Sequence, residues 1–125
     1  MILEKGLKAE SKTIVVEELT AKVMGSGDMP VFATPAMVAL MENAAMCAVA
    51  DALSEGQTTV GSAISTSHLC PSKMGAEIRA EAELVEVEGR RLQFRVRAYD
   101  GERVIGEGEH TRFVVDKERF LAKLA

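Results

Sequence analysis

A run of apolar residues from Pro35 to Ala50 constrains the fold of this chain more than any other segment. Within the run, only Glu42 and Asn43 are polar. Alanine, methionine and leucine dominate it, and these residues favour an α-helix. Thr34 and the proline after it supply an N-cap and a first helical residue, which predicts a helix from Thr34 to about Leu53. Because this helix is apolar on nearly every side, we expect it to be buried all round.

The rest of the chain is patterned as strands and turns. Residues 12–20 are rich in β-branched side chains and predict a first strand, and residues 24–31 predict a loop. After the helix, strands are predicted over residues 57–70, 76–87, 91–99 and 103–115, followed by a short charged segment. One helix laid across an antiparallel sheet of about five strands gives an α+β fold, and a second copy of the chain would cover the rest of the helix.

Several details of the strands are specific enough to test. A slip in the alternation at Leu84-Val85 predicts a bulge, and Glu88-Gly89 and Asp100-Gly101 predict hairpin turns. In the third of these strands, the residues on the apolar face are Leu92, Phe94, Val96 and Ala98. Gly106 and Gly108 share one face of the last strand, which would let another element pack closely there.

Composition limits the class of protein. The 125 residues suit a single domain over residues 1–125, and the net charge of −4 argues against nucleic acid as a partner. Glu4 interrupts any signal peptide, and the polar residues in the apolar run exclude a membrane span, so we expect a soluble cytoplasmic protein. Cys47 and Cys70 predict free thiols, with Cys47 in the core. The two histidines and two cysteines show no metal-ligand spacing.

Glu42 is the first candidate for chemistry. A carboxylate in an apolar setting is costly without a partner, and the same desolvation suits a base or nucleophile near neutral pH. From the residues alone, two roles for Glu42 are equally favoured: a catalytic group, or a buried carboxylate that pairs with an arginine to fix the helix. His68 lies in a polar strand end, where a histidine is usually a surface residue, but beside Glu42 it could share a proton with it. His110 is interpreted as structural or solvent-facing.

A series of motifs resembles the hotdog-fold thioesterases, and among them the fluoroacetyl-CoA thioesterase group, over roughly residues 12–125. The resemblance implies a hotdog fold, an antiparallel sheet of about five strands wrapped around one long central helix. The motifs are, in chain order, Val31-Phe-Ala-Thr34, Met37-Val-Ala-Leu-Met-Glu42, Gly61-Ser-Ala-Ile-Ser-Thr-Ser-His68, Glu88-Gly-Arg-Arg-Leu92, Asp100-Gly101 and Gly106-Glu-Gly-Glu-His-Thr-Arg112.

The resemblance also implies a set of site residues. It assigns catalysis to Thr34, Glu42 and His68, and substrate binding to Gly61 and Arg112. Thr34 is equally explained as a helix cap, and Gly61 as a strand glycine that eases a bend. For Arg112 the alternative is a surface pair with one of two neighbouring glutamates, Glu107 or Glu109.

The spacing along the helix raises a geometric problem for this set. Eight residues separate Thr34 from Glu42, a rise of about 12 Å, so the two side chains cannot touch within one regular helix. Either the helix starts after Thr34 with a bend, or one of the two residues acts across a subunit interface. The resemblance implies the second, a site shared between the two subunits of a homodimer.

The implied activity is hydrolysis of a small acyl-CoA thioester, with Glu42 as general base or as nucleophile. Coenzyme A is part of the substrate, and no cofactor is expected. A non-catalytic hotdog module that binds an acyl-CoA or related ligand is the alternative, and a hotdog dehydratase or hydratase is a third reading. The chain departs from the fluoroacetyl-CoA group at Pro35, where glycine is expected, and at Asn43, where an aromatic residue is expected. Fluoroacetyl specificity is therefore not implied.

Overall fold

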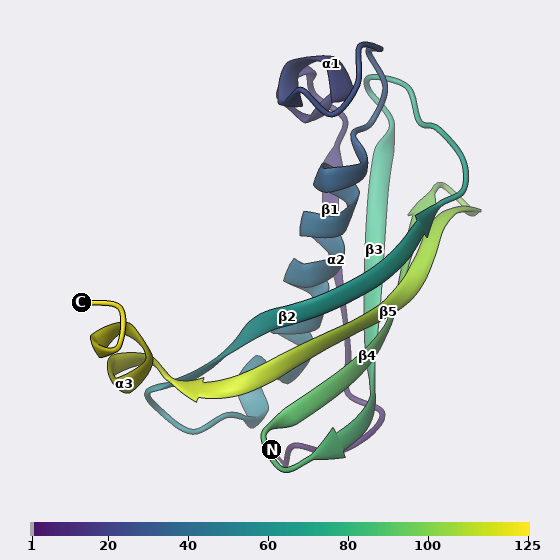
Figure 1. The fold of residues 1–125 in the computed structure, drawn as a ribbon. Helices are drawn as coiled ribbons and strands as arrows, with labels where there is room; N and C mark the ends of the chain where they lie inside the picture. The colour runs from purple at the N-terminus through teal and green to yellow at the C-terminus, as the bar shows by residue number, and fades with distance from the viewer. Residues whose placement is uncertain (1) are drawn as a thin grey trace.

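A strongly curved sheet with one long helix along its inner side makes up most of the computed structural model, which describes residues 2–125 (Figure 1). In these residues five antiparallel strands form one sheet in the order β1-β3-β4-β5-β2. Their bounds are β1 Lys8–Ile14, β2 Gln57–His68, β3 Glu77–Glu88, β4 Arg91–Asp100 and β5 Arg103–Asp116. The long helix is α2 (Thr34–Val49), and the short helices are α1 (Ala21–Met24), α3 (Lys117–Ala122) and the 3₁₀ turns η1 (Glu17–Leu19) and η2 (Ala50–Ala52). The predicted α+β architecture is confirmed.

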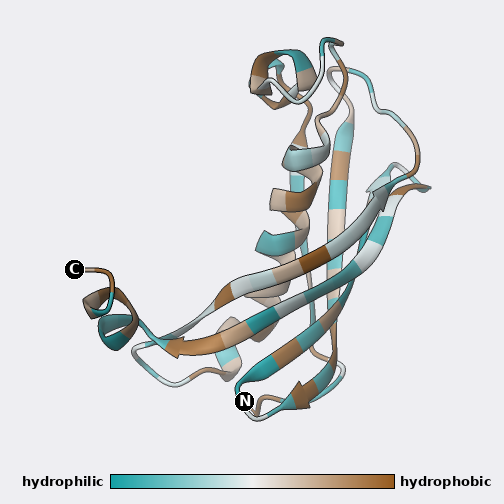
Figure 2. Ribbon diagram, viewed as in Figure 1, coloured by the Kyte–Doolittle hydropathy of each residue, from teal (hydrophilic) through white to brown (hydrophobic). Residues whose placement is uncertain are grey.

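The core lies between α2 and the inner face of the sheet. Hydrophobic and hydrophilic residues alternate along the strands (Figure 2), and Leu92, Phe94, Val96 and Ala98 are buried, as the alternation predicts. Burial of a large side chain such as Met37 or Met41 stabilises the fold by roughly 1.5–3 kcal/mol. The helix buries Ala36, Met37, Met41, Ala44, Ala45, Ala48 and Val49.

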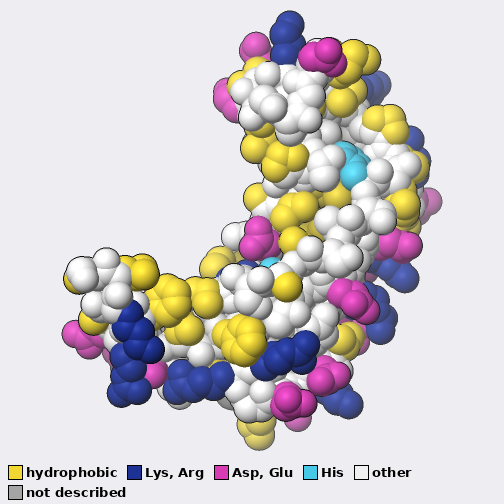
Figure 3. All heavy atoms as spheres, in the orientation of Figure 1, with side chains coloured by type: hydrophobic (Ala, Val, Ile, Leu, Met, Phe, Trp, Pro, Cys, Tyr) yellow, Lys and Arg dark blue, Asp and Glu magenta, His cyan; other side chains and the backbone are white. Residues whose placement is uncertain are grey.

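One side of α2 stays uncovered in the single chain. Its contacts are mainly with β1 and β3, because one curved sheet reaches only part of the helix surface. The exposed stripe consists of Pro35, Ala39, Asn43, Met46 and Cys47. The predicted core position of Cys47 is therefore wrong for the single chain. Burial of the helix on all sides was predicted with a second copy of the chain covering the rest, and it stays a prediction. Figure 3 shows a hollow in the molecular surface with hydrophobic side chains exposed in it.

The first strand begins and ends earlier than predicted. Residues 12–20 were expected to form it, but β1 pairs with β3 over Lys8–Ile14, and η1 follows. Pairing with a long neighbouring strand overrides the low β-propensity of residues such as Lys8 and Glu10. The helix ends four residues before Leu53, and η2 continues the chain to Ala52.

The bulge and both hairpins are confirmed. The β3–β4 register shifts between Leu84 and Glu86, and Gly89 and Gly101 lie in the two hairpin turns with φ of 59° and 65°. A positive φ at these positions favours glycine. Two further shifts, between Gly61 and Ala63 of β2 and between Ala98 and Tyr99 of β4, were not expected from the sequence.

The glycines of β5 allow the close packing that the sequence predicts. A Cβ on Gly106 would lie 2.5 Å from the Met37 sulfur of α2. A Cβ on Gly108 would overlap the backbone carbonyl oxygen of Ser65 on β2. The absence of side chains therefore allows α2 and β2 to approach β5.

We expect Gly108→Ala to destabilise the protein by about 1–3 kcal/mol, because a methyl group that meets a backbone atom cannot be accommodated by a rotamer change. Urea denaturation measures the free energy of unfolding. Glu107→Ala, at the exposed neighbouring residue, is the matched control and should change it by less than about 0.5 kcal/mol. Equal stability of the two variants would contradict the packing described here.

Candidate active site

Thr34 and His68 form a pair at the N-terminal end of α2. Thr34 Oγ1 lies 2.8 Å from His68 Nδ1, within hydrogen-bond distance. Ala33, rather than Thr34, occupies the N-cap position, so the predicted capping role of the threonine is wrong and its hydroxyl contacts the histidine instead. The buried Phe32 ring meets the His68 ring edge-on, at a centroid distance of 6.2 Å. These contacts fix the imidazole at the end of β2.

A small cavity opens beside this pair. Its volume is about 290 Å³, and Thr34, His68, Leu69 and Cys70 are among the residues that line it. Burial lowers the pKa of His68, and the nearby Cys70 backbone opposes this effect in part. The imidazole is therefore neutral at pH 7, the form that can accept a proton.

Glu42 lies farther along α2 and belongs to a different group of residues. Its Oε2 is 3.9 Å from Arg112 Nη1. A Cβ on Gly61 would lie 2.9 Å from the same oxygen. The lack of a side chain at Gly61 thus leaves room for the carboxylate next to β2.

Arg112 is held rigidly beside Glu42. Its side chain is 7% exposed; Nε donates to Thr59 Oγ1 at 2.8 Å, and Nη2 donates to the Thr59 carbonyl oxygen at 2.9 Å. Burial lowers the pKa of Arg112, while Glu42 opposes that shift, and an arginine remains charged in either case. The charge partner of the guanidinium is Glu42, rather than Glu107 or Glu109, so the surface-pair alternative is wrong.

The surroundings of Glu42 differ from the apolar setting that the sequence suggests. In the single chain its side chain is 42% exposed, and it faces a guanidinium. The arginine partner predicted for a structural carboxylate is therefore present. The apolar side chains on either side of Glu42 in the sequence point to other faces of the helix.

Sequence reasoning missed two residues that support this group. Thr59 binds Arg112 through its side chain and its backbone. His110 is 1% exposed and contacts Arg112, so the solvent-facing interpretation of this histidine is wrong. The alternation of β5 could have predicted this burial, because His110 and Arg112 lie on the same face of the strand as the buried Gly106 and Val114.

The predicted site residues form two groups that are far apart in one chain. Within residues 2–125, no hydrogen bond or ion pair joins His68 to Glu42. Gly61 and His68 are seven residues apart on β2, a distance of about 23 Å along an extended strand. One chain therefore brings Thr34 to His68, and Glu42 to Gly61 and Arg112, but does not join the two groups.

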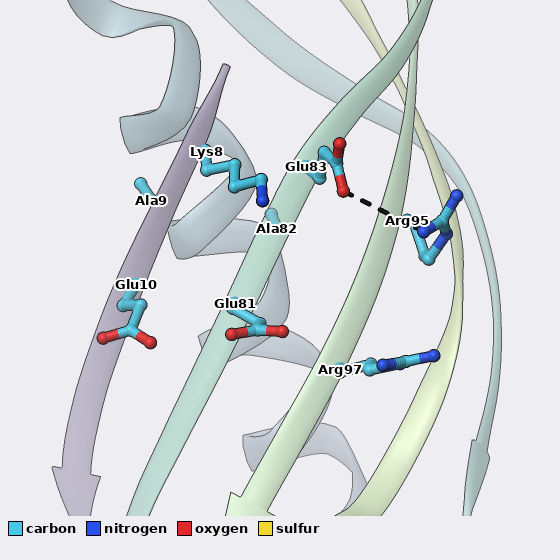
Figure 4. Close-up of a pocket in the computed structure, with 8 residues that line it drawn as sticks. All are labelled: Lys8, Ala9, Glu10, Glu81, Ala82, Glu83, Arg95 and Arg97. Carbon is cyan, nitrogen blue, oxygen red and sulfur yellow. Dashed lines mark ion pairs between the residues drawn. The ribbon is translucent and has the colours of Figure 1, made fainter. Parts of the chain in front are cut away.

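Another hollow lies on the outer face of the sheet, away from α2 (Figure 4). Its volume is about 530 Å³, and charges of both signs from β1, β3 and β4 line it. One pair of these charges is Glu83 and Arg95, 3.9 Å apart. None of the predicted site residues lies there. Among residues 2–125, no group of three or more His, Cys, Asp or Glu side chains is placed to hold a metal ion.

Comparisons with known proteins identify the same family that the sequence motifs resemble. The family model described as fluoroacetyl-CoA-specific thioesterase (FlK) matches residues 15–118. The chain belongs to this family. A fluoroacetyl-CoA thioesterase from Streptantibioticus cattleyicolor is 46% identical over 94 residues, which cover 75% of this chain and 68% of that protein.

Solved structures of thioesterases share the fold. An FlK variant in complex with acetyl-CoA has a TM-score of 0.91 and 35% identity, with coverage of 98% of this chain and 96% of that chain. A Thermus thermophilus hypothetical protein, described as a thioesterase superfamily member, has a TM-score of 0.89 and 31% identity, with coverage of 97% and 90%. The predictions of a hotdog fold and of a thioesterase of the fluoroacetyl-CoA group are confirmed. In the part of the chain described by the structure, no helix has the length and hydrophobicity to cross a membrane.

The half-buried His68 and the buried His110 predict a pH-dependent stability. Burial lowers the pKa of both His68 and His110, so below the ordinary value of 6.5 the unfolded chain binds more protons than the folded chain. The stabilising effect of neutral histidines is present above pH 6.5 and is lost as the pH falls. We expect the Tm to decrease between about pH 7.5 and about pH 5.5, and to decrease less in His68→Asn. Thermal denaturation at constant ionic strength measures both; a Tm that stays constant or rises would contradict the prediction.

Proposed function

We propose that this protein hydrolyses the thioester of a small acyl-CoA. Membership in the thioesterase family supports the reaction, and relatives described in complex with fluoroacetate and with acetyl-CoA support a small acyl group. The observation that carries the proposal is the position of Glu42. Its carboxylate lies beside a fixed, buried guanidinium and against a strand glycine.

Each group has a role that follows from its chemistry. Glu42 takes a proton from water as the water oxygen attacks the thioester carbonyl carbon, or its carboxylate attacks that carbon itself to form an acyl–enzyme anhydride, which water then hydrolyses to the free acid and the Glu42 carboxylate. In both routes the C–S bond breaks and coenzyme A leaves as a thiol. The amides at the N-terminus of α2 stabilise the negative charge on the carbonyl oxygen. His68, oriented by Thr34, moves the proton, and Arg112 with Gly61 shapes the pocket.

We infer that the complete site forms between two copies of the chain. Strand β2 is an edge of the sheet, and between Gly61 and Ser67 it contains no charged residue that would block pairing. Gly61, Ser62, Ala63, Ser65 and Ser67 are exposed along it.

The register of such a pairing follows from the two groups of residues. Antiparallel pairing of two β2 strands, centred between Ile64 and Ser65, sets His68 of the partner subunit opposite Gly61. Since Gly61 adjoins Glu42, this register brings the imidazole toward the carboxylate. A partner in this position would also cover part of the exposed stripe of α2 and lower the exposure of Glu42.

The proposal includes three points that rest on the sequence. The protein acts as a single domain over residues 1–125, needs no cofactor besides the coenzyme A of its substrate, and works in the cytoplasm.

We expect Glu42→Gln and His68→Asn to lower kcat by about 10²-fold or more, because each removes a group that transfers a proton. Thiol release from acetyl-CoA and other short acyl-CoAs measures the rate. Glu109→Gln, on the exposed face of β5, is the matched control and should retain wild-type activity. Unchanged rates in both folded site variants would refute the assignment; binding of acyl-CoA by calorimetry without thiol release would indicate a binding module instead.

A mixture of two inactive variants tests whether the site is shared. If each site combines Glu42 of one copy with His68 of the other, a heterodimer of Glu42→Gln and His68→Asn contains one intact site. Unfolding the two variants together and refolding them should restore about a quarter of the wild-type activity, since half of the randomly paired dimers are mixed. Either variant refolded alone is the control. A mixture that stays inactive while size-exclusion chromatography shows dimers would mean that each site lies within one chain.

A further inference from the structure

His110 lies at the centre of the group around Glu42 and is hydrogen-bonded through both ring nitrogens. Its Nδ1 is 2.8 Å from the carbonyl oxygen of Ala63 on β2, and its Nε2 is 3.1 Å from Arg112 Nη1. The Phe94 ring of β4 packs near the imidazole, at a centroid distance of 6.2 Å. The side chain is buried, so these contacts define its position.

The two partners determine the protonation state of this imidazole. A carbonyl oxygen can only accept a hydrogen bond, so Nδ1 donates to Ala63. A guanidinium can only donate, so Nε2 must accept from Arg112. Both contacts are satisfied only by the neutral ring with its proton on Nδ1. A second proton, on Nε2, would remove the acceptor and place a second positive charge next to the guanidinium.

The contacts of His110 connect the parts of the site. Through Nε2 it holds Nη1 of Arg112, the atom that faces Glu42. Through Nδ1 it binds β2 where the register shifts between Gly61 and Ala63. A Cβ on Gly61 would lie 2.9 Å from Glu42 Oε2 and 3.1 Å from His110 Cε1, so the bulge, the carboxylate and the imidazole meet at one point.

The charges that face His110 come from two elements. Glu42 approaches from α2 and Arg112 from β5, while β2 and β4 present the Ala63 carbonyl and the Phe94 ring. Burial lowers the pKa of His110, the Ala63 hydrogen bond opposes this, Arg112 lowers the pKa further and Glu42 raises it. The ring is therefore neutral at pH 7, as its hydrogen bonds require.

We propose that His110 is a positioning residue of the thioesterase site: Nε2 of the neutral imidazole holds the Arg112 guanidinium toward Glu42, while the hydrogen bond from Nδ1 to the Ala63 carbonyl at the β2 bulge keeps the proton on Nδ1 and leaves Nε2 as the acceptor. This inference rests on the proposed role of Glu42 in thioester hydrolysis. His110 itself acts through Arg112.

Three substitutions in the full chain separate the two hydrogen bonds. His110→Gln can place an acceptor near the position of Nε2, His110→Asn retains only a donor near the position of Nδ1, and His110→Phe retains the ring without either. We expect kcat to fall by about tenfold or more in the Asn and Phe variants, the effect of losing one hydrogen bond to a charged group, while Gln stays within about threefold of wild type. KM should change by less than about threefold in all three, because the loss concerns the transition state.

Val96→Ala is the control for a general loss of stability, since Val96 is buried in the core and lies outside this hydrogen-bond network. It should lower the Tm and leave kcat unchanged. Equal kcat losses in the Gln, Asn and Phe variants, a rise in KM without a change in kcat, or a kcat that follows the Tm across all four variants would each overturn the proposal.

Nitrogen-15 NMR of the imidazole gives a readout that does not depend on turnover. We expect the neutral Nδ1–H tautomer for His110 at pH 7 in the wild-type protein. A cationic ring or the Nε2–H tautomer would overturn the inference. If the wild type hydrolyses no thioester, the proposed function fails, and the tautomer still decides whether His110 can hold Arg112 as described.

Discussion

The buried guanidinium of Arg112 sets the geometry of the side of the sheet that faces Glu42. A buried positive charge needs several acceptors and a counter-charge, and Thr59, His110 and Glu42 supply them from β2, β5 and α2. The carboxylate position thus depends on contacts that also hold the edge strand to its neighbour. The electrostatic requirement of one arginine joins the helix to the edge of the sheet at the place where we propose that the chemistry occurs.

Much of the fold could be predicted because its signals are local. The alternation from Leu92 to Ala98, the bulge at Leu84 and the glycines of the two hairpins are readable over a few residues. The first strand was misplaced because its stability comes from pairing with β3, which no local pattern records. The burial of Cys47 was misjudged for a similar reason: hydrophobicity shows that a side chain can be buried, but the extent of the sheet decides whether it is.

The candidate site was predicted less completely than the fold. Motif similarity selected Thr34, Glu42, His68, Gly61 and Arg112, and the structure shows which of them meet. Motif similarity could not show that Thr34 contacts His68 while Glu42 contacts Arg112, because those contacts depend on where β2 crosses α2. Thr59 and His110 were missed because a polar residue on the inner face of a strand looks like an exception to the alternation. Here the inward polar residues form one hydrogen-bonded group.

Strand β2 is an edge strand without charged residues between Gly61 and Ser67, and this has a consequence in the cell. Its exposed residues are small, and a strand of this kind offers backbone donors and acceptors to any extended polypeptide nearby. If two copies of the chain pair through β2 as proposed, a single subunit exposes this edge until it meets its partner and can bind other extended chains in the meantime, and dilution prolongs that interval. The same residues of β2 would then affect both aggregation and assembly.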